Sequence, residues 1–382
     1  MIKYMYRVVT FSIIALIGFV SYKNISDIYQ DYYTEESSVV QSTDFDELVN
    51  YSAKRFDENS SSQAMYDDGI KTESVHMVIP SGEPIGIYVK TEGVMVIGTT
   101  SFEAYDGRMI SPCEGLFQAG DYITQVDGYS IEDKSSLIDI IINSQGKTLK
   151  LKVIRDGVEK VIRVAPHQNK DGVYLLGLWV KDDISGIGTL TFIDEHGFAA
   201  LGHSINDNDT GTVFSISDGA IYDTNLVNIV KSEAGKPGRL EGMIDYSKEN
   251  IMGRVEENCQ YGINGYMTKN GVDEYGGGEW LPVGKKEEAC IGDAYILSAI
   301  SGEPVYYSIK ITDIDISSSA GNKGLQIEVT DQRLLEMTNG IVQGMSGTPI
   351  IQNGKLLGAI THVFVKDSTK GYGTFVENMF DD

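Results

Sequence analysis

From about Gly172 to the C-terminus, short β-branched segments alternate with glycines, and long helical patterns are few. Examples are IGTLTFID (187–194), IIQNGKLLGAITHVFV (350–365) and YGTFVE (372–377). Short apolar runs bounded by turn residues are typical of strands, and 42 glycines against 8 prolines suit a chain with many tight turns. The sequence therefore predicts one all-β domain, a barrel or a sandwich, over residues 172–382.

A second strand-rich region, residues 74–167, precedes this domain. Strands are expected at VHMVIP (75–80), IGIYVK (85–90) and VMVIGT (94–99), and a hairpin at LKLKVIRDG (149–157) and KVIRVAP (160–166). DKSSLIDIIINS (133–144) has the pattern of a helix that begins at a capping aspartate. One late helix among several strands is predicted for this region.

The run EGLFQAGDYITQVDGYSI (114–131) has the G-L-x-x-G-D-x-I-x-x-V-D-G pattern that is typical of PDZ domains. In this pattern Ile123 and Val126 are expected to face the core. Upstream, Ile85, Gly86 and Ile87 are predicted to supply the carboxylate-binding turn and the strand edge to which an extended peptide adds.

The N-terminus has the features of a membrane anchor. Lys3 and Arg7 precede the apolar run VVTFSIIALIGFVSY (8–22), and no small-residue cleavage site follows. Residues 1–23 are therefore predicted to be an uncleaved transmembrane signal anchor with the rest of the chain exported. Residues 24–73 are polar and acidic and are predicted to be a flexible tether.

Charge and cysteine content exclude several classes of function. A net charge of -24 argues against nucleic-acid partners, because a phosphate backbone would be repelled. The three cysteines match no zinc pattern, although a disulfide between Cys259 and Cys290 is possible. NDNDTG (206–211) lacks the later glutamate of a calcium loop and is interpreted as a turn. Neither a metal nor another cofactor is expected.

The segment GIVQGMSGTPII (340–351) carries the strongest chemical signal. Ser346 lies between glycines in a turn that is followed by a strand, which would let its Oγ project as a nucleophile. The amides of Gly344 and Ser346 are predicted to form an oxyanion hole. A Ser-Gly turn between strands with no catalytic role is the competing interpretation.

A serine nucleophile needs a general base, and His203 is the predicted one. It follows an apolar run and a glycine in FAALGHSI (198–205), at the end of an expected strand. His362 alternates with apolar neighbours and is interpreted as a core residue or as one that supports a residue of the site. The other histidines are His76, His167 and His196.

The third catalytic member should be a carboxylate that holds the imidazole in one tautomer. Asp331, at the end of the IEVTD segment (327–331), is the first choice. Asp209, Asp245 and Asp293 are rivals on composition alone. A competing interpretation makes Asp331 the N-cap of a helix over QRLLEMT.

Taken together, the chain resembles the stage IV sporulation serine peptidases of endospore-forming bacteria, the SpoIVB type. The match runs from the PDZ pattern to the C-terminus. Its most specific parts are GLWVKDDISGIGTLTFID (177–194), ALGHSINDNDTG (200–211) and GIVQGMSGTPIIQNGKLLGAITHVFVKD (340–367).

The resemblance implies a PDZ domain followed by a chymotrypsin-like double β-barrel, with His203, Asp331 and Ser346 as the catalytic residues. It also implies a signalling protease made in the forespore and exported to face the space between two membranes. The implied substrate is a regulator of an intramembrane protease complex that processes a mother-cell sigma factor precursor, and self-cleavage is implied too. The alternatives are a non-catalytic PDZ adaptor with a degenerate protease fold and a general quality-control protease.

Overall fold

The computed structural model describes residues 75–206 and 213–380. The predicted anchor (1–23) and the predicted tether (24–73) lie outside the described residues. Within the described residues, no helix is both long enough and apolar enough to cross a membrane. Most of the described chain consists of strands, as the sequence predicts.

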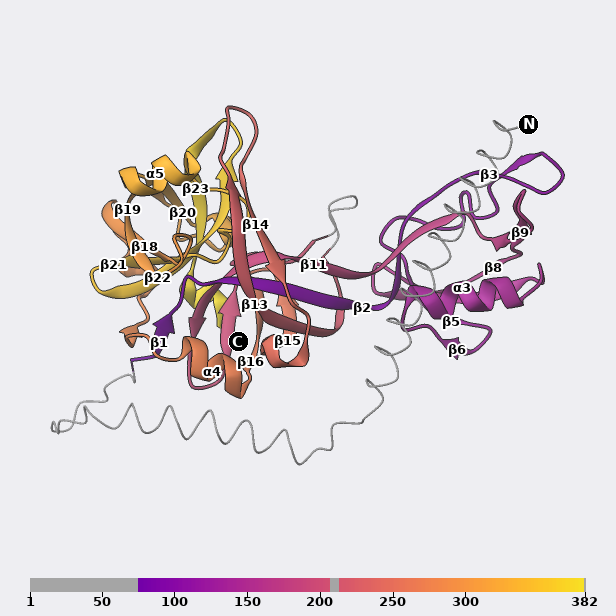
Figure 1. The fold of residues 1–382 in the computed structure, drawn as a ribbon, viewed down its shortest axis with the longest axis horizontal. Helices are drawn as coiled ribbons and strands as arrows, with labels where there is room; N and C mark the ends of the chain where they lie inside the picture. The colour runs from indigo at the N-terminus through magenta and orange to yellow at the C-terminus, as the bar shows by residue number, and fades with distance from the viewer. Residues whose placement is uncertain (1–74, 207–212, 381–382) are drawn as a thin grey trace, which may run out of the picture. The chain divides into compact units, whose positions relative to one another are not determined.

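Six strands close the first barrel (Figure 1), in the order β2 (Pro84–Thr99), β11 (Leu178–Ile193), β12 (Phe198–Ala200), β16 (Gly262–Met267), β15 (Ile251–Cys259) and β13 (Ile216–Val230). The first half of β2 closes the ring, because Ile87 pairs with Gly186 on one side and with Ile221 on the other. Alternate residues of these strands point inward and form one apolar core, which includes Ile85, Ile87, Val89, Leu190, Phe198, Ile221 and Ile263.

A second barrel follows in the sequence and also closes. Its strands are β18 (Gly292–Ser298), β19 (Val305–Ile314), β20 (Leu325–Val329), β23 (Asp367–Phe375), β22 (Lys355–Phe364) and β21 (Pro349–Gln352), in that order around the ring. Its core is built from β-branched and aromatic side chains such as Ile296, Tyr307, Ile309, Ile327 and Ile350. The predicted double β-barrel is therefore present.

Short elements connect and flank the barrels. They are β1 (Met77–Pro80), β14 (Arg239–Ile244), η1 (Lys248–Asn250), α4 (Lys269–Tyr275), β17 (Leu281–Pro282), η2 (Lys286–Glu288), η3 (Ser318–Lys323), α5 (Gln332–Thr338) and η4 (Val376–Met379). β1 pairs with both β11 and β17, so residues 77–80 belong to the first barrel. Strand β14 forms a long ribbon with β13.

A smaller unit with its own core lies between the two halves of the first barrel in the sequence. It contains β3 (Phe102–Glu103), β4 (Met109–Ile110), β5 (Tyr122–Val126), β6 (Tyr129–Ser130), α3 (Lys134–Asn143), β7 (Leu149–Arg155), β8 (Val158–Val164), β9 (His167–Gln168) and β10 (Tyr174–Leu175). The predicted helix is confirmed, since Asp133 caps α3 by accepting a hydrogen bond from the Ser136 amide at 2.7 Å. Ile123 and Val126 are fully buried, as predicted.

The predicted start of the PDZ region, at residue 74, does not fit the strand pairing. The strands predicted at 85–90 and 94–99 are one strand, because β2 runs through TEG (91–93) from the first barrel into the smaller unit. Strand β11 returns alongside it, so that Ile85 pairs with Gly188 in the barrel and Met95 pairs with Lys181 in the smaller unit. Residues 77–90 therefore complete the peptidase barrel, and the smaller unit is an insertion in that barrel.

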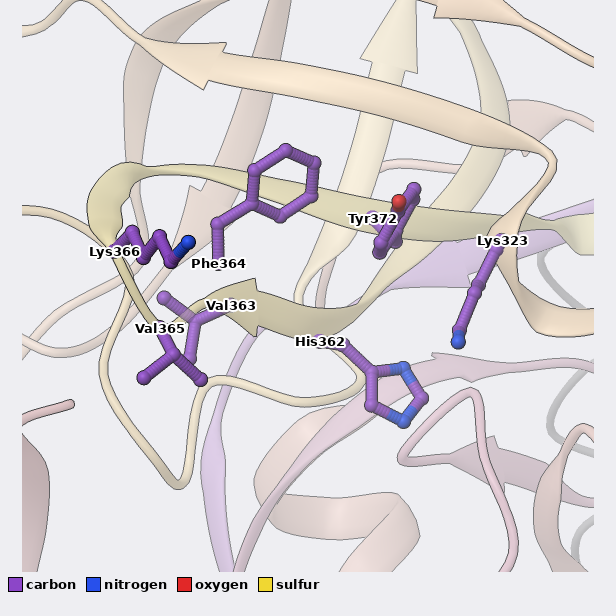
Figure 2. Close-up of a pocket in the computed structure, with 7 residues that line it drawn as sticks. All are labelled: Lys323, His362, Val363, Phe364, Val365, Lys366 and Tyr372. Carbon is purple, nitrogen blue, oxygen red and sulfur yellow. The ribbon is translucent and has the colours of Figure 1, made fainter. Parts of the chain in front are cut away.

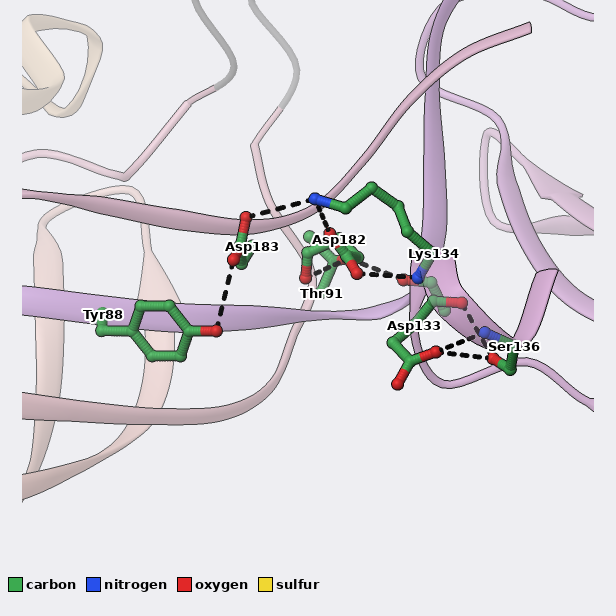
Figure 3. A network of polar contacts seen from close by, with 8 residues as sticks. Tyr88, Thr91, Asp133, Lys134, Ser136, Asp182 and Asp183 are labelled. Atoms are coloured by element: carbon green, nitrogen blue, oxygen red, sulfur yellow. Dashed lines mark hydrogen bonds and ion pairs between the residues drawn. The ribbon is translucent and has the colours of Figure 1, made fainter. Parts of the chain in front are cut away.

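Polar side chains tie the smaller unit to the barrel where the two strands pass between them (Figure 3). Thr91 Oγ1 donates hydrogen bonds to the carbonyls of Gly93, at 2.6 Å, and Asp182, at 3.1 Å. The Asp182 carboxylate accepts the Lys134 amide at 2.7 Å and pairs with its Nζ at 2.6 Å. The first residue of α3 is thus held by a carboxylate from β11.

Candidate active site

Ser346 lies on the loop between α5 and β21. The backbone angles of this loop require the two glycines that flank it, Gly344 and Gly347. Gly344 has φ +100° and Gly347 has φ +98°, a region that disfavours residues with a side chain. A Cβ on Gly347 would lie 2.2 Å from the carbonyl oxygen of Thr189, so no larger residue fits there. Met345 is 1% exposed and anchors the loop in the core of the second barrel, while Ser346 remains partly exposed.

The carbonyl groups of this loop are held by the first barrel. The Thr189 amide donates to the Ser346 carbonyl at 3.0 Å, and Thr189 Oγ1 donates to the Gly344 carbonyl at 2.7 Å. The N–H groups of Gly344 and Ser346 donate no hydrogen bond to any residue that the structure describes. Two fixed carbonyls and two available amides suit a site that stabilises an oxyanion.

His203 is positioned by a sharp backbone turn after β12. Leu201 has φ +74° and Gly202 has φ +71°, and Gly202 packs against Ile360 and Thr361 of β22. The imidazole Nδ1 lies 2.9 Å from the carbonyl oxygen of Ser204. Because a carbonyl only accepts, this contact places the proton on Nδ1 and leaves Nε2 with a lone pair. Burial lowers the pKa of His203 below its ordinary value.

Three chain segments meet at this place. The Ser346 hydroxyl donates to the Thr361 carbonyl at 2.9 Å, and the next residue, His362, has its ring centroid 5.1 Å from that of His203. A Cβ on Gly347 would lie 2.5 Å from the Leu201 amide nitrogen, so the serine and histidine loops touch. No hydrogen bond joins Ser346 to His203 in the part of the chain that the structure describes, and their catalytic pairing stays a prediction.

Asp331 does not lie with these residues. Its carboxylate caps α5, accepting from the Arg333 amide at 2.9 Å, the Arg333 side chain at 2.8 and 3.0 Å, and the Ser308 amide at 3.2 Å. The Arg333 side chain, as the main cause, lowers the pKa of Asp331 to about 2. In this structure Asp331 is therefore the N-cap of α5, as the alternative to a catalytic role predicted.

The strand register explains why Asp331 is distant. His362 pairs with Tyr372, and Tyr372 pairs with Gln326 at the start of β20. β20 continues from Gln326 to Val329, about 10 Å at the rise of a strand, and Asp331 follows two residues after its end. In this structure the Asp331 carboxylate caps α5, and the Nδ1 atom of His203 bonds to the Ser204 carbonyl instead.

None of the rival carboxylates that the structure describes bonds to His203 either. Asp245 accepts a hydrogen bond from the Ser247 amide, and Asp293 is exposed. Asp209 lies outside the described residues. The group that fixes the tautomer of His203 in this structure is the carbonyl of its own neighbour, a contact that no pattern of side chains could have indicated.

His362 is the residue near the site whose role the sequence left open. Its ring contacts that of His203, and it lines a pocket with Lys323, Val363, Phe364, Val365, Lys366 and Tyr372 (Figure 2). Burial, and then the charges of His203 and Lys323, lower the pKa of His362 to about 4. A neutral imidazole therefore lies beside the predicted base at neutral pH.

The peptide-binding residues predicted for the PDZ domain are also misplaced. Ile85 and Ile87 are 0% and 5% exposed in the core of the first barrel, and β2 is paired on both sides there. A Cβ on Gly86 would lie 2.7 Å from side-chain atoms of Ile244 and Thr224. A strand with neighbours on both sides has no free edge, so no peptide can add to it.

Among the described residues, the smaller unit has an unpaired strand edge at the start of β11. Leu178 pairs with Thr99, while the Thr100 amide donates to the Gly177 carbonyl at 2.9 Å. Leu178 and Thr99 therefore face each other without hydrogen bonds between them. The N–H and C=O groups of Leu178 point away from β2. Leu178 also packs on the core cluster to which α3 contributes Leu137. The sequence analysis did not predict this strand edge at LLGLWV (175–180).

Two family models match parts of this chain. Residues 172–380 match the family model for SpoIVB peptidase S55, and residues 90–165 match the model for the PDZ domain. The protein is therefore a serine peptidase that carries a PDZ domain. The S55 match covers more than half of the chain, so the chain belongs to the SpoIVB peptidase S55 family. The PDZ match begins at residue 90, after the part of β2 that lies in the barrel.

Solved structures similar to parts of this chain include proteases and a PDZ domain. The inactive form of the Rv3671c protease from M. tuberculosis is 14% identical, over 50% of this chain and 80% of that one, with a TM-score of 0.27. The HtrA-type protease AlgW with a decapeptide is 12% identical, over 55% and 54%, with a TM-score of 0.24. The PDZ domain of the SdrC-like protein from Listeria monocytogenes is 22% identical, over 24% and 90%, with a TM-score of 0.20.

Proposed function

We propose that this chain is an endopeptidase in which Ser346 is the nucleophile and His203 the general base. In the proposed reaction, Ser346 Oγ leaves the Thr361 carbonyl, gives its proton to Nε2 of His203 and attacks the scissile carbonyl. The imidazolium then protonates the leaving amine, and water hydrolyses the acyl-enzyme by the same route. The amides of Gly344 and Ser346 stabilise the negative oxygen of each tetrahedral intermediate.

The observation that carries this proposal is the availability of those two amides beside Ser346. Thr189 fixes their loop through the carbonyls of Gly344 and Ser346, and a fixed loop of this kind can hold amides ready for an oxyanion. The tautomer of His203, with Nε2 unprotonated, is also the one that a general base requires.

The PDZ domain is proposed to capture the extended C-terminus of a protein by strand addition at Leu178 and Val180. The backbone N–H and C=O groups of both residues point to the side of β11 that faces away from β2. Since β11 continues from this edge into the barrel, the domain would position a protein substrate, or a second copy of the enzyme, without contributing to the chemistry.

The biological role that we propose is signalling during sporulation. The chain would be anchored by residues 1–23, exported across the forespore membrane, and would cleave a regulator of an intramembrane protease complex, and also itself. Membership of the SpoIVB peptidase S55 family supports this role. Its test is replacement of the native family member in an endospore-forming host: wild type should restore processing of the mother-cell sigma factor precursor, and Ser346→Ala should not.

Peptide cleavage by the purified chain tests the catalytic assignment. Ser346→Ala and His203→Ala should each lower the rate by about four to six orders of magnitude, because the two residues act as a unit. The control is Ser368→Ala, which removes an exposed hydrogen bond to Asn339 in the same barrel. Retained activity in folded Ser346→Ala protein would rule out the mechanism.

A further inference from the structure

The pocket beside His362 lies along an open edge of β22, close to the nucleophile. Strand β21 pairs with β22 only as far as Ala359, and the Ile360 amide and carbonyl bond to Thr348 and Gly347. From His362 to Phe364, β22 pairs with β23 alone among the described residues. An edge of this kind can accept a further strand.

The direction of β22 determines which part of a bound peptide would lie along this edge. Ser346 Oγ contacts the Thr361 carbonyl, and the strand then runs away from the nucleophile through His362 toward Lys366. A peptide added antiparallel to it would run toward Ser346. The residues before the scissile bond would therefore lie against the pocket.

The pocket combines apolar and cationic side chains (Figure 2). It encloses about 410 Å³, and Phe364 and Tyr372 contact each other with ring centroids 4.7 Å apart. Lys323 Nζ lies 5.5 Å from the centre of the Tyr372 ring. Neither Lys323 nor Lys366 forms an ion pair with any residue that the structure describes. Figure 2 places them on either side of the apolar group.

Two unpaired lysines at one place are notable in a chain with a net charge of -24. The overall charge repels acidic peptides at long range, whereas these two cations attract a carboxylate at short range. His362 adds no positive charge at neutral pH, because its pKa is about 4. Cations on the neighbouring strands β22 and β23 are engaged: Lys355 pairs with Glu288, and Lys370 pairs with Asp367.

We propose that Lys323 and Lys366 make this enzyme selective for extended substrates with acidic residues shortly before the scissile bond, beside apolar side chains that pack on Phe364 and Tyr372. This inference rests on the proposed peptidase function. It names the substrate class for that same site. A peptide of this class would pair its carboxylates with the two lysines and its backbone with the open edge of β22.

Matched fluorogenic peptides test the proposal with the full-length chain. One apolar sequence is made with Glu, Gln or Lys at two to four residues before the scissile bond, and kcat/KM is measured for each. Each partly exposed ion pair is worth up to about 1 kcal/mol, or about fivefold, so wild type should favour Glu over Gln by about three- to tenfold. Lys should be the poorest residue at these positions.

Charge variants then assign the preference to the two lysines. In Lys323→Gln/Lys366→Gln the ratio of Glu to Gln substrates should fall to about one, and in Lys323→Glu/Lys366→Glu the Lys peptide should become the best substrate. Lys310→Gln on β19 of the same barrel is the matched control and should keep the wild-type ratio. A cooperative thermal unfolding transition, measured for each variant, shows that the variant folds.

Two results would overturn the proposal: equal cleavage of Glu and Gln peptides by wild type, or a Glu preference that survives in the double Gln variant. A preference for Lys peptides in wild type would show that the overall negative charge dominates, and would also overturn it. Failure of the peptidase function itself is distinguishable, because wild type would then cleave none of the peptides.

Discussion

Nδ1 of His203 lies 2.9 Å from the carbonyl oxygen of Ser204, so the residue that follows the histidine holds the imidazole in the tautomer a general base needs. A carbonyl fixes the tautomer as a carboxylate would, but it adds no negative charge to stabilise an imidazolium. Burial lowers the pKa of His203, and no carboxylate of the described residues opposes that effect.

The pH dependence of catalysis follows from that shift. A lowered pKa keeps His203 neutral, and therefore able to accept a proton, to pH values below 6.5. The acid limb of kcat/KM for a neutral peptide should thus have its midpoint below pH 6.5. A midpoint at or above pH 7 would indicate that a carboxylate acts on His203 and that this account of its environment is wrong.

Replacing Asp331 should affect stability more than catalysis. Asp331→Ala removes the N-cap of α5 and should lower the free energy of unfolding by about 1 kcal/mol. Because the folded-state pKa is about 2, this contribution is present above the ordinary value of 3.8 and is lost as pH falls toward 2. The rate at pH 7.5 should stay within about tenfold of wild type, whereas loss of a triad aspartate costs about 10⁴.

Asp331→Asn sharpens this test, because asparagine also caps helices well. Its unfolding curve should lie close to that of wild type, with Asp293→Asn as an exposed control in the same barrel. A folded Asp331→Asn protein that has lost most of its rate would return Asp331 to the catalytic group and would require a rearrangement of β20 and α5.

Substitutions at two glycines of β2, Gly86 and Gly98, test whether residues 85–87 belong to the barrel. Gly86→Ala puts a Cβ within 2.7 Å of Ile244 and Thr224 and should destabilise the barrel by about 1 to 3 kcal/mol. A Cβ on Gly98 meets nothing within 4 Å, so Gly98→Ala on the same strand should change stability by less than about 0.5 kcal/mol. Thermal and urea unfolding give both values.

The Gly86→Ala experiment also has a functional readout. Because Gly86 belongs to the peptidase barrel, short peptides and protein substrates should be cleaved with equal losses. A loss confined to protein substrates would show that residues 85–87 serve peptide capture after all.

Glu83 makes stability depend on pH in the direction opposite to Asp331. Burial, and then the nearby charges of Asp223 and Glu274, raise its pKa to about 7. The fold therefore favours protonated Glu83, and this contribution to stability is complete below pH 4.5 and is lost as pH rises through 7. Glu83→Gln should raise Tm at pH 8 and leave it nearly unchanged at pH 4.5. Glu114→Gln, at an exposed position, should have no such effect; equal effects of the two variants would contradict the assignment.

Local patterns were sufficient to predict much of the fold. The helix that begins after Asp133 is set by its cap and its apolar spacing, and the turn at Asp156-Gly157 by the positive φ angles that those residues tolerate. The loop around Ser346 was predictable because glycines are needed on both sides of a projecting nucleophile. These features depend on residues close together in the sequence.

Features that depend on distant pairing were not predictable in this way. TEG has the composition of a turn, but β2 continues through it because β11 pairs with the strand before and after it. Asp331 follows a strand and precedes Ser346 by few residues, yet the barrel register separates it from His203. The contact of His203 with His362 joins β22 to the turn after β12, and no local pattern links those two segments.

The most direct test of the central claim is the site at which a fluorophosphonate probe reacts with the chain. The account predicts one adduct on Ser346, found by mass spectrometry of the labelled protein, and no adduct in Ser346→Ala. Labelling should be slower by orders of magnitude in His203→Ala and nearly unchanged in Asp331→Asn. Absence of an adduct in folded wild-type protein, or an adduct on another serine, would contradict the assignment of Ser346 as the nucleophile.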